Sequence, residues 1–194
     1  FLWKDMPDAK LPKMPTTGES WYSTAALDIL RLSSKNHIDV PIELPIGIIH
    51  IIVAHPTPPI FEGDDHHNSL RNFDEIRLLA DYITPKKGDY LYDDKGQEGG
   101  LTATHFIIMG DMNADPTKGN SHENAINQLI KHENIHHIPA TNTTSWGLRV
   151  DYVLPSKSLK VQTSGVFLPM SSHPLYSLVK TSSDHRLVWA DIAI

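Results

Sequence analysis

The sequence predicts an α/β fold, because apolar runs of strand length alternate along the chain with segments of helical periodicity. The clearest strand is Ile48–Ala54, a near-continuous apolar run typical of a strand buried on both faces. The clearest helix covers residues 68–83, where apolar residues recur every three or four positions. With 194 residues and no internal repeat, the chain is expected to form one domain over 1–194.

The first elements are irregular. Residues 1–20 are rich in Pro and Lys and are expected to form an extended arm. Tyr22–Leu32 predicts a short helix, with a continuation into a strand left open. The longest apolar run, Ile46–Ala54, is interrupted by His50 and is far shorter than the ~20 residues of a membrane span. The stretch HPTPP ends this strand, because proline has no N–H for the sheet.

Strands dominate the rest of the chain. Thr84–Pro85 ends the second helix, and residues 86–104 predict an exposed loop. Phe106–Met109 predicts a short buried strand with Gly110 opening a turn, and Ser121 is expected to cap a helix that runs to about His132. Three further strands are predicted: Arg149–Leu154, a weak one at Gly165–Leu168, and Leu187–Ile194.

The composition excludes some classes of site. The chain has no cysteine, so disulfides and thiolate metal sites are excluded. A net charge of −6 argues against a broadly basic nucleic-acid surface, although a local positive groove stays open. The 12 histidines include the pairs His66–His67 and His136–His137. A metal site made of these pairs is a minor alternative, since loop histidines are more often solvated.

Polar side chains mark one end of four predicted strands, as expected where an α/β sheet assembles a site from distant segments. They are His55, Asp111 with Asn113, Asp151, and Asp184 with His185. Each alone has a structural explanation, because Gly, Asp, Asn and Pro favour turns and a histidine after a strand is often a turn residue. Four together favour a functional site.

These residue types suit phosphoryl transfer by metal-activated water. Oxygen atoms of Asp111, Asn113 and Asp184 are ligands that Mg²⁺ or Mn²⁺ prefers. His185 backed by the carboxylate of Asp151 has the character of an oriented general base. His55 and a cation, for which Lys35 is a candidate, are expected to face the charge that develops on the phosphoryl oxygens.

In order and spacing, AHPTPP, GDMNADP, LRVDYVLPS and SSDHRLVW resemble the endonuclease/exonuclease/phosphatase superfamily, whose founding fold is that of deoxyribonuclease I. The resemblance covers about residues 32–194 and is nearest to a bacterial branch with no fixed substrate. It implies the C-terminal part of a four-layer α/β/β/α sandwich, Mg²⁺ or Mn²⁺ as cofactor, and a phosphoester substrate that includes nucleic acid as one option. A secreted or periplasmic location is one expectation from the same branch.

The resemblance also implies roles for individual residues. Asp111 would contact the attacking water or the metal, and Asn113 would bind the scissile phosphate. Asp184 would be a carboxylate near the metal, while His185 would deprotonate the water with Asp151 behind it. His55 would touch phosphate or protonate the leaving oxygen. Two residues are candidates for a further substrate contact. Lys35 would be a basic contact to phosphate, and His37 is the alternative for the same role.

Two parts of the family pattern are missing. Members carry an N-terminal strand that ends in Asn and a following Glu that is the main metal ligand; Glu19 lacks the strand context for that role. The chain is therefore expected to be an N-terminally incomplete domain. Relatives often have a longer, substrate-facing loop where this chain has residues 140–148, so this segment is expected to have lost residues. The leading hypothesis is a metal-dependent phosphodiesterase or phosphatase, and the alternative is an inactive domain that serves as a binding or scaffold module.

Overall fold

The computed structural model describes residues 1–45, 47–139 and 141–193, and it confirms the α/β fold. Ile46, Ala140 and Ile194, which belong to predicted segments, lie outside the described residues. The main sheet has the order β1-β2-β3-β4, with a parallel β2–β3 pair and antiparallel pairs on either side. Its strands are β1 (His37–Leu44), β2 (Gly47–Ala54), β3 (Phe106–Asp111) and β4 (Asp151–Pro155). A second sheet pairs β5 (Lys160–Val166) with β6 (Val188–Ala193).

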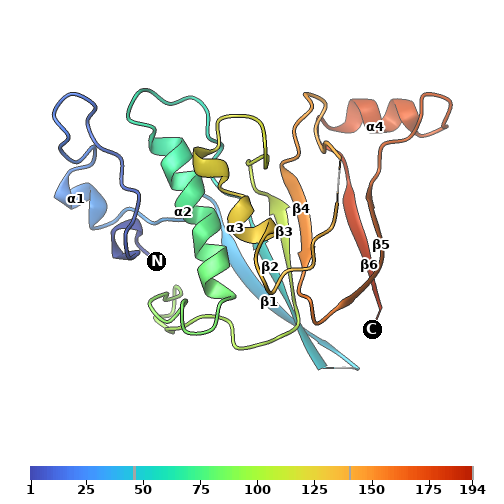
Figure 1. The fold of residues 1–194 in the computed structure, drawn as a ribbon, viewed down its shortest axis with the longest axis horizontal. Helices are drawn as coiled ribbons and strands as arrows, with labels where there is room; N and C mark the ends of the chain where they lie inside the picture. The colour runs from blue at the N-terminus through green and yellow to red at the C-terminus, as the bar shows by residue number, and fades with distance from the viewer. Residues whose placement is uncertain (46, 140, 194) are drawn as a thin grey trace.

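Helices and the second sheet lie on opposite faces of the main sheet (Figure 1). Helices α2 (His67–Tyr82) and α3 (Asn127–Ile130) cover one face, where Ile52, Ile76 and Ile108 form part of the largest apolar core. On the other face, Ile107 and Leu159 form a smaller core with Ile192 of β6 packed against it. The site therefore rests on a sheet that is packed from both sides at β3.

The N-terminal arm packs against α2. It contains η1 (Trp3–Asp5) and α1 (Thr24–Leu27). Trp3 is fully buried, and its indole N–H donates to Asp74 of α2 at 2.7 Å. The helix predicted over Tyr22–Leu32 is too long: α1 ends at Leu27, and Arg31 instead pairs with Leu2 in an isolated bridge.

Strand β1 was missed by the sequence analysis. Its sequence HIDVPIEL contains Pro41, which argues against a central strand. The structure resolves this conflict because β1 is at the edge of the sheet, where proline is tolerated. The prediction that Ile48–Ala54 is buried on both faces is also wrong in part, since Ile48 is 52% exposed.

Two predicted elements are broken or shifted. The helix predicted from Ser121 to His132 is split into η2 (His122–Asn124) and α3, because Glu123 and Asn124 adopt positive φ angles of 46° and 50°. The Oγ of Ser121 does accept the N–H of Ala125. The weak strand at Gly165–Leu168 overlaps only the end of β5. Helix α4 (Tyr176–Ser182) was not predicted.

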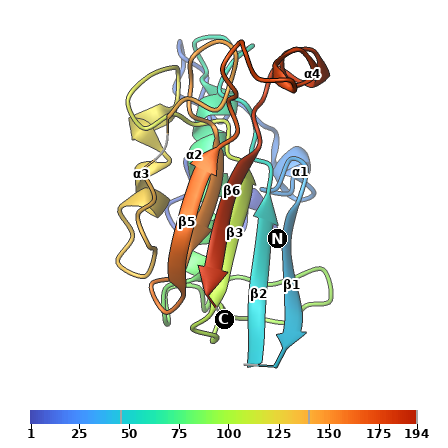
Figure 2. The ribbon, with the colours of Figure 1, turned by 90° about the vertical axis from the view of Figure 1, so that its right-hand side faces the viewer.

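One face of β1 and β2 is uncovered. Figure 2 shows β5 and β6 in front of the sheet, with β1 and β2 open on that side. The side chains of Ile38, Val40 and Ile42 alternate along β1 and are 41–49% exposed. The second sheet thus covers the part of the main sheet that carries the candidate site, but not its β1 edge.

Candidate active site

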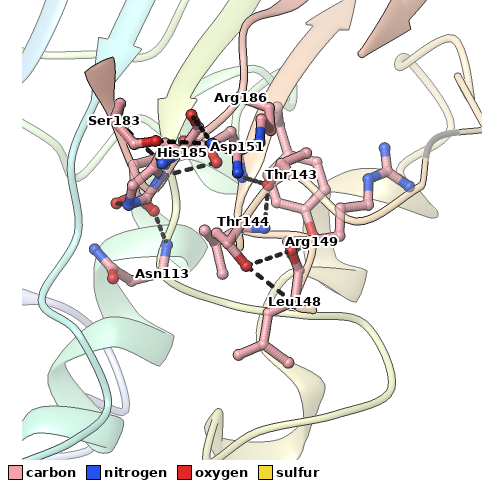
Figure 3. A network of polar contacts seen from close by, with 12 residues as sticks. Asn113, Thr143, Thr144, Leu148, Arg149, Asp151, Ser183, His185 and Arg186 are labelled. Carbon is pink, nitrogen blue, oxygen red and sulfur yellow. Dashed lines mark hydrogen bonds and ion pairs between the residues drawn. The ribbon is translucent and has the colours of Figure 1, made fainter. Parts of the chain in front are cut away.

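Strand topology brings the predicted residues to one edge of the main sheet. His55 follows β2, and Asp111 ends the parallel strand β3. Asp151 begins the antiparallel strand β4 and is the register partner of Asp111. His185 lies just before β6, at the same edge (Figure 3). Segments that are 130 residues apart in the sequence therefore meet because sheet pairing places their ends together.

A glycine allows β2 and β3 to approach closely beside the site. Gly110 has φ +146°, and a Cβ built there would lie 2.0 Å from the carbonyl oxygen of Ala54. The prediction that Gly110 opens a turn is wrong, since it lies within β3. Its lack of a side chain lets the strand ends pack together, and His55 Nε2 comes within 3.6 Å of Asp111 Oδ2.

His185 and Asp151 form the best-defined polar pair of the site. The Nδ1 of His185 lies 2.9 and 3.0 Å from the two carboxylate oxygens of Asp151 (Figure 3). Burial by itself lowers the pKa of His185, but the hydrogen bond and charge of Asp151 outweigh burial and raise this pKa above its usual value. With Nδ1–H donated to Asp151, the Nε2 of His185 is left to act toward the site.

Asp111 faces both histidines. Its Oδ2 lies 4.0 Å from His185 Nε2, in addition to the contact with His55. Burial and the nearby charge of Asp151 raise the pKa of Asp111, although the backbone N–H of Asn113 partly offsets them. Two carboxylates and one imidazole offer ligand atoms that all lie within 4.8 Å of one another, namely those of Asp111, Asp151 and His185. This surplus of negative charge suits a cation.

Asn113 connects the site to the loop after β2. It adopts the left-handed conformation with φ 51°, and its backbone N–H donates to Asp111 Oδ1 at 2.9 Å. Its side-chain amide donates to the carbonyl of Pro56 at 3.0 Å. The Nζ of Lys35 is 3.5 Å from the same carbonyl oxygen. The structure thus gathers Asn113 and Lys35 around the residue that follows His55.

Two predicted residues are not brought into this cluster. Both ring nitrogens of His37 are engaged elsewhere, Nδ1 with the Ser33 hydroxyl at 2.9 Å and Nε2 with the Glu75 carbonyl at 3.0 Å. Burial lowers the pKa of His37. Asp184 is exposed, and its carboxylate is not one of the three groups named above. The roles of His37 in substrate binding and of Asp184 in metal binding stay predictions.

The segment 143–148 contains functional positions that the sequence analysis missed. The hydroxyl of Thr143, which is fully buried, accepts the backbone N–H groups of Val150 and Asp151 at 3.0 and 3.1 Å. The carbonyl of Thr143 accepts the N–H of Arg186, and Ser145 N–H donates to the carbonyl of Asp184, both at 2.8 Å (Figure 3). A segment expected to have lost residues therefore braces both partners of the Asp151–His185 pair.

A buried glutamate braces the loop that carries His55. Glu75 of α2 is fully buried, and its carboxylate accepts the backbone N–H groups of Ser34 and Thr57 at 2.7 and 2.5 Å. The hydroxyl of Ser34 donates to the same carboxylate. Nothing in the sequence indicated this role, because Glu75 is a single acidic residue within the predicted helix.

The histidine pairs do not form a shared site. His66 lies 3.7 Å from Glu62, and His67 contacts Asp65. Across residues 1–45, 47–139 and 141–193, the cluster at Asp111 is the one group with metal-ligand spacing. The minor alternative of a histidine-pair metal protein is not supported by the described part of the chain.

The α/β architecture, with carboxylates and histidines gathered at one sheet edge, is that of the deoxyribonuclease-I-like class. The chain belongs to the endonuclease/exonuclease/phosphatase family, whose model matches residues 28–185. That match agrees with the sequence resemblance. No curated protein matches the chain.

Solved structures support the fold alone. An endonuclease/exonuclease/phosphatase from Beutenbergia cavernae is 16% identical with a TM-score of 0.51, and the match covers 80% of this chain and 38% of that one. Beta toxin from Staphylococcus aureus is 14% identical with a TM-score of 0.47, and the match covers 71% of this chain and 49% of the toxin chain. Sphingomyelinase C from Streptomyces griseocarneus is 12% identical with a TM-score of 0.43, and the match covers 82% of this chain and 55% of the sphingomyelinase chain. The chain thus spans about half the length of these structures.

In the described part of the chain, no helix has the length and apolar character needed to cross a bilayer.

Proposed function

We propose that this chain carries the general-base half of a metal-dependent phosphoesterase site. The observation that carries the proposal is the His185–Asp151 pair, whose free ring nitrogen faces Asp111 at 4.0 Å. In the proposed reaction, water attacks phosphorus and its proton goes to His185 Nε2. The bond from phosphorus to the leaving oxygen breaks, and no covalent enzyme intermediate forms.

Each residue has a specific part in this proposal. Asp151 holds the tautomer of His185 and stabilises the imidazolium that forms. His55, on the β2 side of Asp111, is placed to protonate the leaving oxygen. Asn113 donates one amide hydrogen to Pro56, so its second amide hydrogen is available to a phosphoryl oxygen. Lys35 reaches the same loop and is proposed to attract the anionic substrate.

The donor set fits a divalent cation. Asp111 and Asp151 would hold the ion, since carboxylate oxygens are the ligands that Mg²⁺ and Mn²⁺ prefer, and Asp184 stays a candidate for a further ligand. When bound, such an ion polarises phosphoryl oxygens and lowers the pKa of coordinated water. Burial, and then the nearby charge of Asp151, raises the pKa of Asp111, as expected for a carboxylate that is held beside a second one.

Hydrolysis of bis(p-nitrophenyl) phosphate by the full chain, with and without Mg²⁺, tests the proposal. His185→Ala is expected to lower kcat by roughly 10²- to 10⁴-fold, the usual contribution of a positioned general base. His137→Ala, at an exposed histidine outside the cluster, is the matched control and is expected to keep the wild-type rate. Turnover of His185→Ala within twofold of wild type would show that the role assignment is wrong.

A non-catalytic binding domain is the second candidate. It is favoured by the small donor set: within the described residues Asp111, Asp151 and His185 are the one group with metal-ligand spacing, and affinity for Mg²⁺ follows ligand number. Calorimetric titration distinguishes the two candidates. Binding of Mg²⁺ and of a phosphate diester without turnover would support a binding module, whereas Mg²⁺-dependent turnover that His185→Ala removes would support the enzyme.

The substrate is proposed only as a phosphoester. A nucleic acid stays one option, and a secreted or periplasmic bacterial location is part of the proposal because the resemblance is nearest to such a branch. The chain is proposed to form a single domain of the family.

A further inference from the structure

Trp146 is a large apolar side chain at the candidate site that none of the roles above uses. Its ring centroid is 5.2 Å from that of His185, and the two rings are nearly perpendicular, at 83°. The residue is 50% exposed. A ring that touches the proposed general base on one side and is half open on the other is placed to contact something bound there.

The backbone fixes Trp146 relative to His185. Trp146 lies in a turn that Gly147 closes with φ +86°, and Gly147 N–H donates to the Thr144 carbonyl at 3.3 Å. Thr144 pairs with His185 in an isolated bridge. Because the same turn is bonded on both sides of His185, the backbone that carries the indole is held beside the proposed general base. Rigid aromatic side chains of this kind bind at a low entropic cost.

The order of the strands indicates which part of a substrate Trp146 contacts. Asp111 lies between His55 on the β2 side and the His185–Asp151 pair on the β4 side. In phosphoryl transfer the attacking and leaving oxygens are roughly in line. If His185 takes the proton of the attacking water, the leaving oxygen lies toward His55. The leaving group is then directed away from Trp146.

We propose that Trp146 is a specificity-determining residue that contacts the non-reacting ester arm of a phosphodiester and favours an apolar or aromatic arm. This inference rests on the proposed function, because it names the substrate class of the same site. A monoester has no such arm and gains nothing from the indole. The indole is therefore proposed to favour phosphodiesters over phosphomonoesters at this site.

Three substrates with the same leaving group test this: p-nitrophenyl phenyl phosphate, methyl p-nitrophenyl phosphate and p-nitrophenyl phosphate. An aromatic contact alone contributes about 2- to 13-fold, and burial of the larger arm adds to this. Wild type is therefore expected to prefer the phenyl arm to the methyl arm by about tenfold in kcat/KM. Trp146→Ala is expected to reduce this ratio to within about twofold, and Trp146→Phe to retain most of it.

Trp21→Ala is the matched control. Trp21 is 41% exposed and also stacks on a histidine, His67, with ring centroids 6.2 Å apart. It lies in the N-terminal arm, outside the cluster. This variant is expected to keep the wild-type phenyl-to-methyl ratio. A ratio that is unchanged in Trp146→Ala would overturn the proposal, because a merely structural role for the indole does not depend on the ester arm.

Failure of the proposed function is distinguishable from failure of this inference. If wild type hydrolyses none of the three substrates with Mg²⁺, the proposed function fails, and the contact is tested by binding instead. NMR titration with phenyl methylphosphonate and with methyl methylphosphonate follows the backbone amide signals of the site in wild type and variant, and in wild type also the indole N–H signal of Trp146. Tighter binding of the phenyl compound to wild type, lost in Trp146→Leu, supports the contact, and equal binding of both compounds overturns it.

Discussion

Gly110→Ala tests whether the close approach of β2 and β3 builds the site. Gly110 has φ +146°, where a residue with a Cβ is strained by about 1–3 kcal/mol. The new Cβ would also lie 2.0 Å from the carbonyl oxygen of Ala54, which is backbone and has no rotamer to move into. Forcing these strands apart adds about 1–3 kcal/mol by analogy with an overpacked core. The free energy of unfolding is therefore expected to fall by about 2–6 kcal/mol in total, a large share of the roughly 5–15 kcal/mol of a typical domain.

Gly99→Ala is the matched control for this prediction. Gly99 also has a positive φ, +112°, but a Cβ there meets nothing within 4 Å. The Gly99→Ala variant is expected to lower the free energy of unfolding only by the cost of backbone strain, about 1–3 kcal/mol. Urea denaturation measures both variants. With an m-value of about 2 kcal/mol per molar, the midpoint of Gly110→Ala is expected about 0.5–1.5 M below that of Gly99→Ala.

The same experiment has a refuting result. If the two alanine variants unfold at the same urea concentration, the contact with Ala54 has no cost in stability. The close approach of the strands would then not require a glycine at position 110. The variant should also lose part of the proposed activity, since strand separation moves His55 away from Asp111.

Two further predictions concern groups outside the reacting atoms. Thr143→Val leaves the backbone N–H groups of Val150 and Asp151 without their hydroxyl acceptor, so the free energy of unfolding should fall by about 1–3 kcal/mol; an unchanged urea midpoint contradicts this. Burial raises the pKa of Asp74, so the folded state binds its proton more tightly than the unfolded state. This stabilisation is full below the ordinary pKa of about 3.9 and is lost as pH rises through the raised value. Asp74→Asn should therefore become more stable relative to wild type between pH 3.5 and pH 7, and a pH-independent difference in thermal unfolding contradicts this.

The sequence predicted those helices and strands whose apolar pattern lies within a single continuous segment. The helix predicted over residues 68–83 is α2, because its apolar spacing directly reflects the face that packs on the sheet. The strand at Ile48–Ala54 is β2 for the same reason. Strand β1 was hidden because Pro41 argues against a strand unless its place at the sheet edge is known.

The candidate site was predictable as a set of residues but not as an arrangement. The four motifs identified His55, Asp111, Asp151 and His185, and the structure places these at one edge. Nothing in the sequence TNTTSWGL indicates that the hydroxyl of Thr143 accepts the backbone N–H of Asp151, since the turn that carries Thr143 is also bonded to Arg186, far along the chain before β6. The same non-local pairing explains why Trp146 could not be singled out from the sequence.

Two backbone features set the distances within this site, and they act from opposite sides of Asp111. On the β2 side, Gly110 lets the strand end that carries His55 come close. On the β4 side, the turn of residues 143–148 is bonded to Asp151 through Thr143 and to both neighbours of His185. A turn whose only purpose was to connect strands would need neither constraint. Since both constraints converge on carboxylates that remain close together, the fold maintains an acidic cluster whose charge a bound cation or a proton would neutralise.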